Sequence, residues 1–419
     1  MRSFIVLFLC VVLSLPVFAM KVYFDDPQYS FQLLRALGDT AAGAADIGEC
    51  LKTAYRIKEG DGESWYREWY KTAEELEADG NEFLSRGHKL SASEAFMRAS
   101  NYYRSAEFFL HGNPDDPRIL QSWEKSRDMF VKAVGLIDQP IVKAVNIHFE
   151  KTTLPAYYCL VDDSGKKRPL IIIHSGYDGT KEELYYTVGL PALRRGYNCL
   201  LFEGPGQGEV IRAQKIPFRP DWETVVTPVV DFALDQPEVD PERIALMGIS
   251  FGGYLAPRAA AFEPRIKTCI ANGGVYDFHS NFVANNPPDF EKELDDPKAA
   301  KEIDQAIYAE MKKDPGLRWV FNNGMFTFRS KTPSELIRMT RPYTMQGIAD
   351  KIKCNMLVVN SEGDKDMPGQ AIKLYDSLQS PKTYMEFTKE EGAEEHCQMG
   401  AAFISNERIY NWLDENLQK

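Results

Sequence analysis

The sequence lacks the residue patterns on which several classes of protein depend. Its 419 residues include 7 cysteines and 6 histidines, with no CxxC pair and no cluster of metal-ligating side chains. It has no P-loop and no dinucleotide fingerprint, since no phosphate-binding pattern follows the structural turn Gly204-Pro205-Gly206-Gln207-Gly208. We therefore expect no metal and no cofactor, and the cysteines allow no disulfide assignment.

Basic residues are in the minority. Lys and Arg number 49 against 61 Asp and Glu, which gives a net charge of −12, and no basic cluster stands out. This balance argues against nucleic acid or an anionic membrane surface as a partner. The 44% hydrophobic content predicts a folded core, and the length suits one large domain plus an accessory one. The expected partner is a small-molecule substrate, and a homodimer is compatible with the sequence.

No apolar run is long enough for an ordinary membrane span, because the stretch near the N-terminus has only about sixteen residues. Residues 1–19 instead have the anatomy of a signal peptide: Arg2, the apolar segment Phe4 to Leu13, and the small-residue site Val17-Phe18-Ala19. We expect cleavage after Ala19 and a secreted or periplasmic protein without stable membrane insertion. An uncleaved anchor is the alternative.

Residues 20–138 are predicted to form a helical accessory or cap domain. Trp69, Leu76 and Phe83 are spaced seven apart, which predicts a helix over 65–83. Ser91 and Glu94 fit a capping box that would open the next helix. The aromatic residues over 65–83 and 96–109 make these two helices candidate walls of a substrate pocket, and the alternative is that they pack on one another.

From residue 139 the pattern changes to strands that alternate with helices, which predicts a mostly parallel sheet covered on both faces. Residues 275–350 interrupt this pattern, with helices expected around 297–312 and 333–339. Such an insertion would lie over the carboxyl ends of the strands, where ligands bind in these sheets. The eight expected strands cover residues 145–150, 156–161, 170–174, 197–202, 243–247, 267–271, 356–360 and 383–387.

The strongest local signal is Gly248-Ile249-Ser250-Phe251-Gly252-Gly253. It follows the fifth expected strand and precedes a helix-compatible stretch, the context of a nucleophile elbow. Glycines suit this turn because the strand and helix backbones approach closely. The pattern predicts Ser250 as a nucleophile.

A serine needs a base and an acid that orients the base. His396 follows the last expected strand and is the candidate base. Asp364 follows the seventh strand and is the candidate acid, with Asp366 and Glu362 as alternatives. The order serine, acid, histidine is the one expected of this architecture.

An oxyanion hole needs two backbone N–H groups. One is expected from Phe251, the residue after the nucleophile. The other is expected from the loop after the third strand, from Tyr177 or Gly176. His174 begins this loop and is expected to hydrogen-bond within it.

These motifs resemble one branch of the α/β-hydrolase superfamily, which contains 2,6-dihydroxypseudooxynicotine hydrolase, fungal polyketide-shortening pigment hydrolases and FrsA-like esterases. The resemblance covers about residues 140–419 and implies an eight-stranded α/β-hydrolase fold with a Ser250–Asp364–His396 triad beneath an N-terminal helical cap. The motifs that carry it are Ser175 to Glu183, Phe202-Glu203-Gly204-Pro205-Gly206-Gln207-Gly208-Glu209, the elbow at Ser250, and His396-Cys397-Gln398.

Two features bear on the substrate. Asp178 occupies the place of an extra acid in the members that cleave carbon–carbon bonds, although Tyr-Asp-Gly also suits a plain turn. Glu203 departs from the branch, where Asp is commoner, and so does the signal peptide.

Three hypotheses follow. The first is a serine hydrolase that acts through an acyl-enzyme on a small or medium ester or amide. The second is a carbon–carbon bond hydrolase of a β-diketone or polyketide-like substrate, assisted by Asp178. The third is a non-catalytic binding protein that uses the helical N-terminal half as a docking surface.

Overall fold

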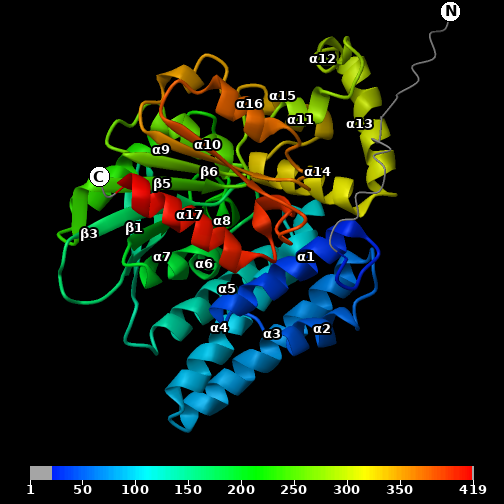
Figure 1. Ribbon diagram of the computed structural model, residues 1–419. Helices are drawn as coiled ribbons and strands as arrows, with labels where there is room; N and C mark the ends of the chain where they lie inside the picture. The colour runs from blue at the N-terminus through cyan, green and yellow to red at the C-terminus, as the bar shows by residue number, and fades with distance from the viewer. Residues whose placement is uncertain (1–20, 418–419) are drawn as a thin grey trace, which may run out of the picture.

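The computed structural model describes residues 21–417 and has an eight-stranded sheet at its centre (Figure 1). The strand order is β1-β2-β4-β3-β5-β6-β7-β8; β2 is antiparallel to both neighbours, and the pairs from β4 to β8 are parallel. The predicted α/β-hydrolase fold is confirmed. The strands are β1 (Ile141–Phe149), β2 (Thr152–Leu160), β3 (Arg168–His174), β4 (Asn198–Phe202), β5 (Val239–Ile249), β6 (Thr268–Asn272), β7 (Asn355–Ser361) and β8 (Lys382–Phe387).

The apolar strands form because both faces of the sheet are buried. In β3, Ile171 and Ile173 join one hydrophobic cluster, whereas Leu170 and Ile172 join the cluster on the opposite face. Side chains alternate across a strand, so a strand between two helical layers must be apolar at every position. The parallel strands therefore bring their carboxyl ends, with the loops that follow them, to one edge.

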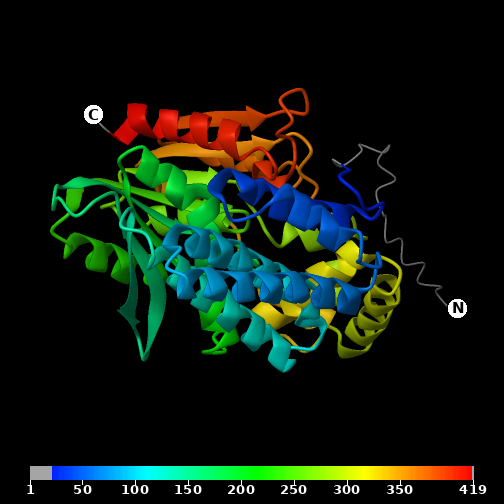
Figure 2. The ribbon, with the colours of Figure 1, turned by 90° about the horizontal axis from the view of Figure 1, so that it is seen from below.

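The N-terminal helices gather along one side of the sheet, in blue to cyan in Figures 1 and 2. One hydrophobic cluster contains Trp65 and Tyr102 from these helices together with Ile171 and Leu201 from the sheet. The helices therefore share a continuous core with the sheet. They are α1 (Pro27–Gly38), α2 (Ile47–Ala54), α3 (Gly62–Ser85), α4 (Lys89–Ala106) and α5 (Pro117–Val134), with the 3-10 segments η1 (Asp39–Ala42) and η2 (Glu107–Gly112).

The predicted capping box at Ser91 is wrong. Helix α4 begins at Lys89, so Ser91 lies inside it. The reason is the tight connection from α3: Gly87 has a φ of 80°, which reverses the chain and starts the next helix at once.

The remaining helices follow the strands or belong to the insertion. The predicted insertion helices correspond to α13 (Pro297–Met311) and α15 (Pro333–Thr340), while α14 (Pro315–Phe328) was not predicted. The connecting helices are α6 (Lys181–Leu184), η3 (Tyr185–Gly189), α7 (Leu190–Arg194), α8 (Gly208–Arg212), α9 (Glu223–Leu234), α10 (Gly252–Ala260), η4 (Ala349–Lys351), α16 (Gln370–Ser377), η5 (His396–Gln398) and α17 (Ala402–Leu417). The insertion helices are α11 (Ser280–Val283), α12 (Phe290–Glu293), α13 (Pro297–Met311), α14 (Pro315–Phe328) and α15 (Pro333–Thr340).

The predicted signal peptide at residues 1–19 lies outside the described residues. Among residues 21–417, no helix combines the length and the apolar character that crossing a bilayer would require.

Buried charges join the N-terminal helices to the sheet region. Glu107 in η2 pairs with Arg212 in α8, whose Nε donates to Oε1 at 3.1 Å, and with His111 Nε2 at 2.7 Å. All three side chains are almost fully buried. Burial alone would raise the pKa of Glu107, but the two basic partners outweigh it and lower that pKa to about 2.

We predict that Glu107→Gln lowers the free energy of unfolding by about 3–5 kcal/mol, because Arg212 would stay buried without its carboxylate. The pKa of Glu107 lies below its ordinary 4.5 in the folded state. Its contribution is therefore present above pH 4.5 and is lost as the pH falls toward 2. Urea unfolding at pH 7 and at pH 3.5 measures both effects.

The matched control is Glu242→Gln, which removes the partner of Lys267 in a pair that is largely exposed. We expect a change within about 0.5 kcal/mol for it. Equal losses in the two variants would contradict the argument from burial.

Candidate active site

Ser250 lies in a sharp turn between β5 and α10. Its φ is 62°, in the left-handed region that residues with a side chain seldom adopt. The turn is held by two hydrogen bonds: Ser250 N–H donates to Asn272 O at 2.8 Å, and Gly253 N–H donates to Ser250 O at 2.7 Å. The strand, turn and helix have the arrangement that the sequence predicted.

The glycines around Ser250 are required by close backbone contacts. A Cβ on Gly248 would lie 2.0 Å from Gly252 O, and a Cβ on Gly253 would lie 2.1 Å from Gly273 O. Neither distance is compatible with a side chain. The pattern therefore reflects packing of the helix start against two neighbouring backbones.

Ser250, His396 and Asp364 are brought together at the carboxyl edge of the sheet. Ser250 Oγ donates to His396 Nε2 at 2.8 Å, and His396 Nδ1 donates to Asp364 Oδ2 at 2.7 Å. Asp364 Oδ1 accepts the N–H groups of Asp366 and Met367 at 2.9 and 3.0 Å. These contacts leave Asp364 with its charge directed at the imidazole.

Burial and charge act in opposite directions on this pair. Burial would raise the pKa of Asp364, but the His396 charge and the hydrogen bonds it accepts lower that pKa below its ordinary value. Burial would lower the pKa of His396, but Asp364, and secondarily Cys397, raise it well above its ordinary value. The pair therefore favours an imidazolium when the histidine takes up a proton.

The alternative acids, Asp366 and Glu362, make hydrogen bonds other than the one that Asp364 accepts from His396. Asp366 gives its N–H to Asp364, while Glu362 accepts the N–H of Lys389 at 2.8 Å, away from the imidazole. Asp364, Asp366 and His396 each place one ligand atom within 4.8 Å of the others, the spacing of a metal site. However, both ring nitrogens of His396 are already hydrogen-bonded, to Asp364 and Ser250.

The loop that carries His396 is held by the two residues that follow the histidine. Cys397 and Gln398 have φ values of 52° and 56°, so the chain turns sharply after the histidine. Gln398 Nε2 donates to Ser361 Oγ at 3.0 Å, and Cys397 Sγ lies 3.4 Å from His396 Nε2. The turn aims the imidazole at Ser250.

The predicted oxyanion loop, residues 174–179 at the end of β3, lies directly against the turn that carries Ser250. A Cβ on Gly176 would lie 2.5 Å from the backbone nitrogen of Phe251, so glycine leaves that N–H uncovered. His174 hydrogen-bonds within the loop as predicted, through Nδ1 to Ser175 O at 2.9 Å. Burial lowers the pKa of His174 to about 4, which keeps it neutral near pH 7.

Tyr177 is held at both ends by the unpredicted helix α14. Its hydroxyl donates to Val320 O at 3.1 Å, and Asn323 Nδ2 donates to its carbonyl oxygen at 3.0 Å. Gly324 makes room for this, because a Cβ there would lie 2.1 Å from the tyrosine hydroxyl. The insertion therefore fixes the backbone of the oxyanion loop.

A cavity of about 350 Å³ opens onto Ser250 and His396. The wall contributed by the N-terminal region comes from α1. The aromatic helices over 65–83 and 96–109, expected as wall material, supply no lining residue, because Trp65, Trp69 and Tyr102 pack on one another. The apolar lining residues are Phe31, Leu184, Ile249, Phe278, Phe282, Phe290, Ile303, Ile307, Leu317, Trp319, Val320, Phe321, Ile337, Met367 and Met399.

Asp178, the candidate auxiliary acid, also lines this cavity. Its Oδ2 accepts from Arg35 Nη1 at 2.5 Å. Sequence reasoning missed Arg35 and its second partner, Glu183, because no motif links α1 to this loop. The sequence offers one local signal: Arg35 is a charged residue between apolar neighbours in this helix.

Comparisons with known proteins agree with the fold. Residues 225–419 match the family described as the prolyl oligopeptidase family. The hydrolase acrC of Aspergillus aculeatus is 34% identical over 94% of this chain and 98% of its own length. The 20-hydroxy-prefusarin hydrolase FUS2 of Gibberella moniliformis is 35% identical over 94% of this chain and 97% of its own length.

Among solved structures, that of 2,6-dihydroxy-pseudo-oxynicotine hydrolase has the same fold, with a TM-score of 0.70 and 21% identity, and the match covers 91% of this chain and 96% of that one. The resemblance noted from the sequence is thus confirmed. The chain belongs to the same family of α/β-hydrolases as acrC and FUS2.

We predict that Gly253→Ala lowers the free energy of unfolding by about 1–3 kcal/mol or more, because its Cβ has no space beside Gly273 O. Gly316→Ala, in the first turn of α14, is the control. Its Cβ would meet Asp314 Oδ1 at 3.3 Å, a contact that a shift of a few tenths of an ångström relieves, so stability should change by less than about 1 kcal/mol. Chemical denaturation of both variants measures the difference, and a tolerated Gly253→Ala would refute the packing argument.

Proposed function

We propose that this member of the family is a serine hydrolase that acts through an acyl-enzyme on a small or medium ester or amide. One observation carries the proposal. Within a mainly apolar cavity, His396 is hydrogen-bonded on one side to Ser250 and on the other to Asp364. That arrangement is the one a hydroxyl nucleophile requires.

In this mechanism His396 Nε2 takes the proton of Ser250 as Oγ attacks the substrate carbonyl. Asp364 keeps the Nδ1 proton in place and stabilises the imidazolium that forms. His396 then gives its proton to the leaving oxygen or nitrogen, and the carbonyl–heteroatom bond breaks. Water, deprotonated by the same histidine, then attacks the acyl carbon, and His396 returns that proton to Ser250 Oγ as the acid leaves.

The oxyanion of each tetrahedral intermediate would accept the Phe251 N–H and a second N–H from the loop, from Tyr177 or Gly176. The contact of Gly176 with the Phe251 nitrogen supports this placement. The cavity volume lies near the lower end of the range for small-molecule sites, which favours a substrate of modest size.

A second candidate is hydrolysis of a carbon–carbon bond beside a ketone, in a β-diketone or polyketide-like substrate. Ser250 would attack the ketone, and the carbon leaving group would depart as an enolate that takes up a proton. Two observations favour it: Asp178 lines the cavity, and two compared proteins are named as hydrolases of 20-hydroxy-prefusarin and of 2,6-dihydroxy-pseudo-oxynicotine.

We predict that Ser250→Ala lowers turnover by about three orders of magnitude or more, while the protein stays folded. A fluorophosphonate probe should label wild-type protein and not this variant. Turnover is then measured on acyl esters, aminoacyl amides and β-diketones, which separates the two candidate reactions.

Asp366→Asn is the matched variant for Asp364→Asn. Loss of the Asp364 carboxylate should slow labelling much more than loss of the Asp366 carboxylate, because Asp364 accepts the Nδ1 proton of His396 at 2.7 Å, whereas the Asp366 carboxylate lies only within 4.8 Å of the imidazole. Labelling of Ser250→Ala at the wild-type rate would disprove the nucleophile assignment. No labelling and no turnover in wild-type protein would favour a binding protein on a hydrolase fold.

We also propose that the chain is exported and that its mature form begins near Met20. The support is the sequence of residues 1–19 alone. N-terminal sequencing of protein from its native host is expected to find this start. A mature chain that retains Arg2 would instead indicate an anchor. The homodimer stays a prediction, which the mass in solution would test.

A further inference from the structure

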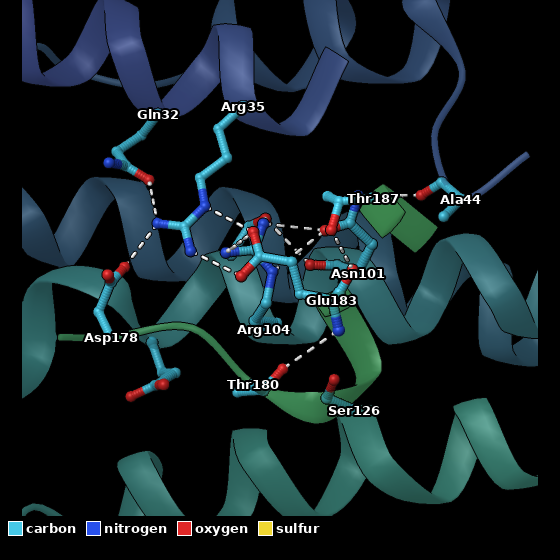
Figure 3. A network of polar contacts seen from close by, with 12 residues as sticks. Gln32, Arg35, Ala44, Asn101, Arg104, Ser126, Asp178, Thr180, Glu183 and Thr187 are labelled. Carbon is cyan, nitrogen blue, oxygen red and sulfur yellow. Dashed lines mark hydrogen bonds and ion pairs between the residues drawn. The ribbon is translucent and has the colours of Figure 1, made fainter. Parts of the chain in front are cut away.

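Two arginines from the N-terminal helices meet two carboxylates beside the oxyanion loop (Figure 3). Arg35 of α1 donates through Nε and Nη2 to both oxygens of Glu183, each at 2.6 Å, and through Nη1 to Asp178 at 2.5 Å. Arg104 of α4 lies 3.5 Å from the same Glu183 carboxylate. Arg35 is thus the guanidinium that bridges the two acids, and Arg104 contacts Glu183 but not Asp178.

The two acids lie on either side of Thr180, the residue that caps helix α6. Asp178 belongs to the oxyanion loop, Thr180 is the N-cap of α6, and Glu183 lies in the first turn of that helix. The loop is folded tightly, since a Cβ on Gly179 would lie 2.0 Å from Ser175 Oγ. A group that binds both Asp178 and Glu183 therefore fixes the loop relative to the helix that follows it.

We propose that Arg35 is a positioning residue of the hydrolase: it holds the oxyanion loop in its productive conformation through Asp178, and so makes catalysis depend on the docking of helix α1. This inference rests on the proposed function, because it assumes that the loop serves Ser250. Arg35 acts on the loop and not on the substrate bond.

The charges in this cluster balance, which accounts for their burial. Arg35, Arg104 and Glu183 are nearly inaccessible to solvent, and the Asp178 side chain is 14% exposed. A third acid, Asp39, is also buried here, but burial, followed by the Glu183 charge, raises its pKa to about 8. Near pH 7 the cluster thus holds two positive and two negative charges. Removing Arg35 would leave two acids with only the more distant Arg104.

The other side of the loop is held independently. Tyr177 is bound by α14 through Val320 O and Asn323, and the Phe108 ring packs between Arg35 and Trp319 of the same helix. The loop is therefore held between α1 on one side and the insertion on the other. With Arg35 absent, the loop would keep the contacts of Tyr177 and the hydrogen bond from Gln207 Nε2 to Ser175 O at 2.6 Å, but Asp178 would lose its partner from α1.

The experiment compares Arg35→Gln with Arg104→Gln in the full-length protein. Both variants remove a buried cation that pairs with Glu183, but only the first removes the contact with Asp178. The main readout is the rate at which a fluorophosphonate labels Ser250, which needs no knowledge of the substrate. We expect Arg35→Gln to slow labelling by about 10- to 100-fold, the effect of misplacing a reacting group by about 1 Å. Arg104→Gln should slow it by less than about 3-fold.

A double-mutant cycle tests whether Arg35 acts through Asp178. Asp178→Ala should slow labelling about as much as Arg35→Gln, and the double variant should be no slower than either one. Arg35→Lys should recover part of the rate, because lysine can reach one acid but cannot bridge two. With p-nitrophenyl butyrate the loss should fall on kcat more than on KM, since the loop acts on the transition state.

Three results would overturn the inference: equal labelling rates for Arg35→Gln and Arg104→Gln, additive losses in the cycle, or a loss confined to KM. If Arg35→Gln does not fold, as judged by circular dichroism, the comparison of Asp178→Ala with Arg104→Gln carries the test alone. Failure of wild-type protein to label at all would refute the proposed function instead, so the two failures can be told apart.

Discussion

The left-handed backbone of Ser250 is the constraint on which the rest of the site depends. A non-glycine residue in this conformation costs about 1–3 kcal/mol, and it persists only where the surroundings fix it. Here they are the hydrogen bond to Asn272 O and the close approach of Gly253 to Gly273. The turn places Oγ at the sheet edge, where the loops after β7 and β8 bring Asp364 and His396 within hydrogen-bonding distance.

The same tight turn determines what can lie beside it. Gly176 sits so close to the Phe251 nitrogen that the oxyanion loop has no freedom to approach differently. This loop starts at a strand end but continues into the cavity, where the sheet no longer supports it. Two of its residues are therefore held by other parts of the chain, Tyr177 by α14 and Asp178 by Arg35. Buried ion pairs add little net stability, but they specify one arrangement over others.

The sequence predicted the structural features that are determined by residues close together in the chain. Short apolar runs made the strands visible, and the elbow, the acid after β7 and His396 after β8 follow from chain order along a parallel sheet. The sequence did not predict α14, whose role is defined by Tyr177, a residue far away in the chain. It placed the cavity wall in the aromatic helices because their stripes are conspicuous. Those stripes instead face one another and the sheet, and a burial pattern does not tell which partner covers a helix.

The residues that line the cavity and the residues of the triad come from different parts of the chain, but the two sets are not independent. The triad comes from loops at strand ends, whereas the apolar lining comes mainly from the insertion, and α1 adds Phe31. Relatives could alter the lining and keep the chemistry, as is common on this kind of fold. However, both walls also touch the oxyanion loop, α1 through Arg35 and the insertion through Val320 and Asn323. A change in the walls that shifts either helix would shift the loop with it. Under the proposed function, substrate fit and reaction rate are therefore coupled through the residues that hold this loop.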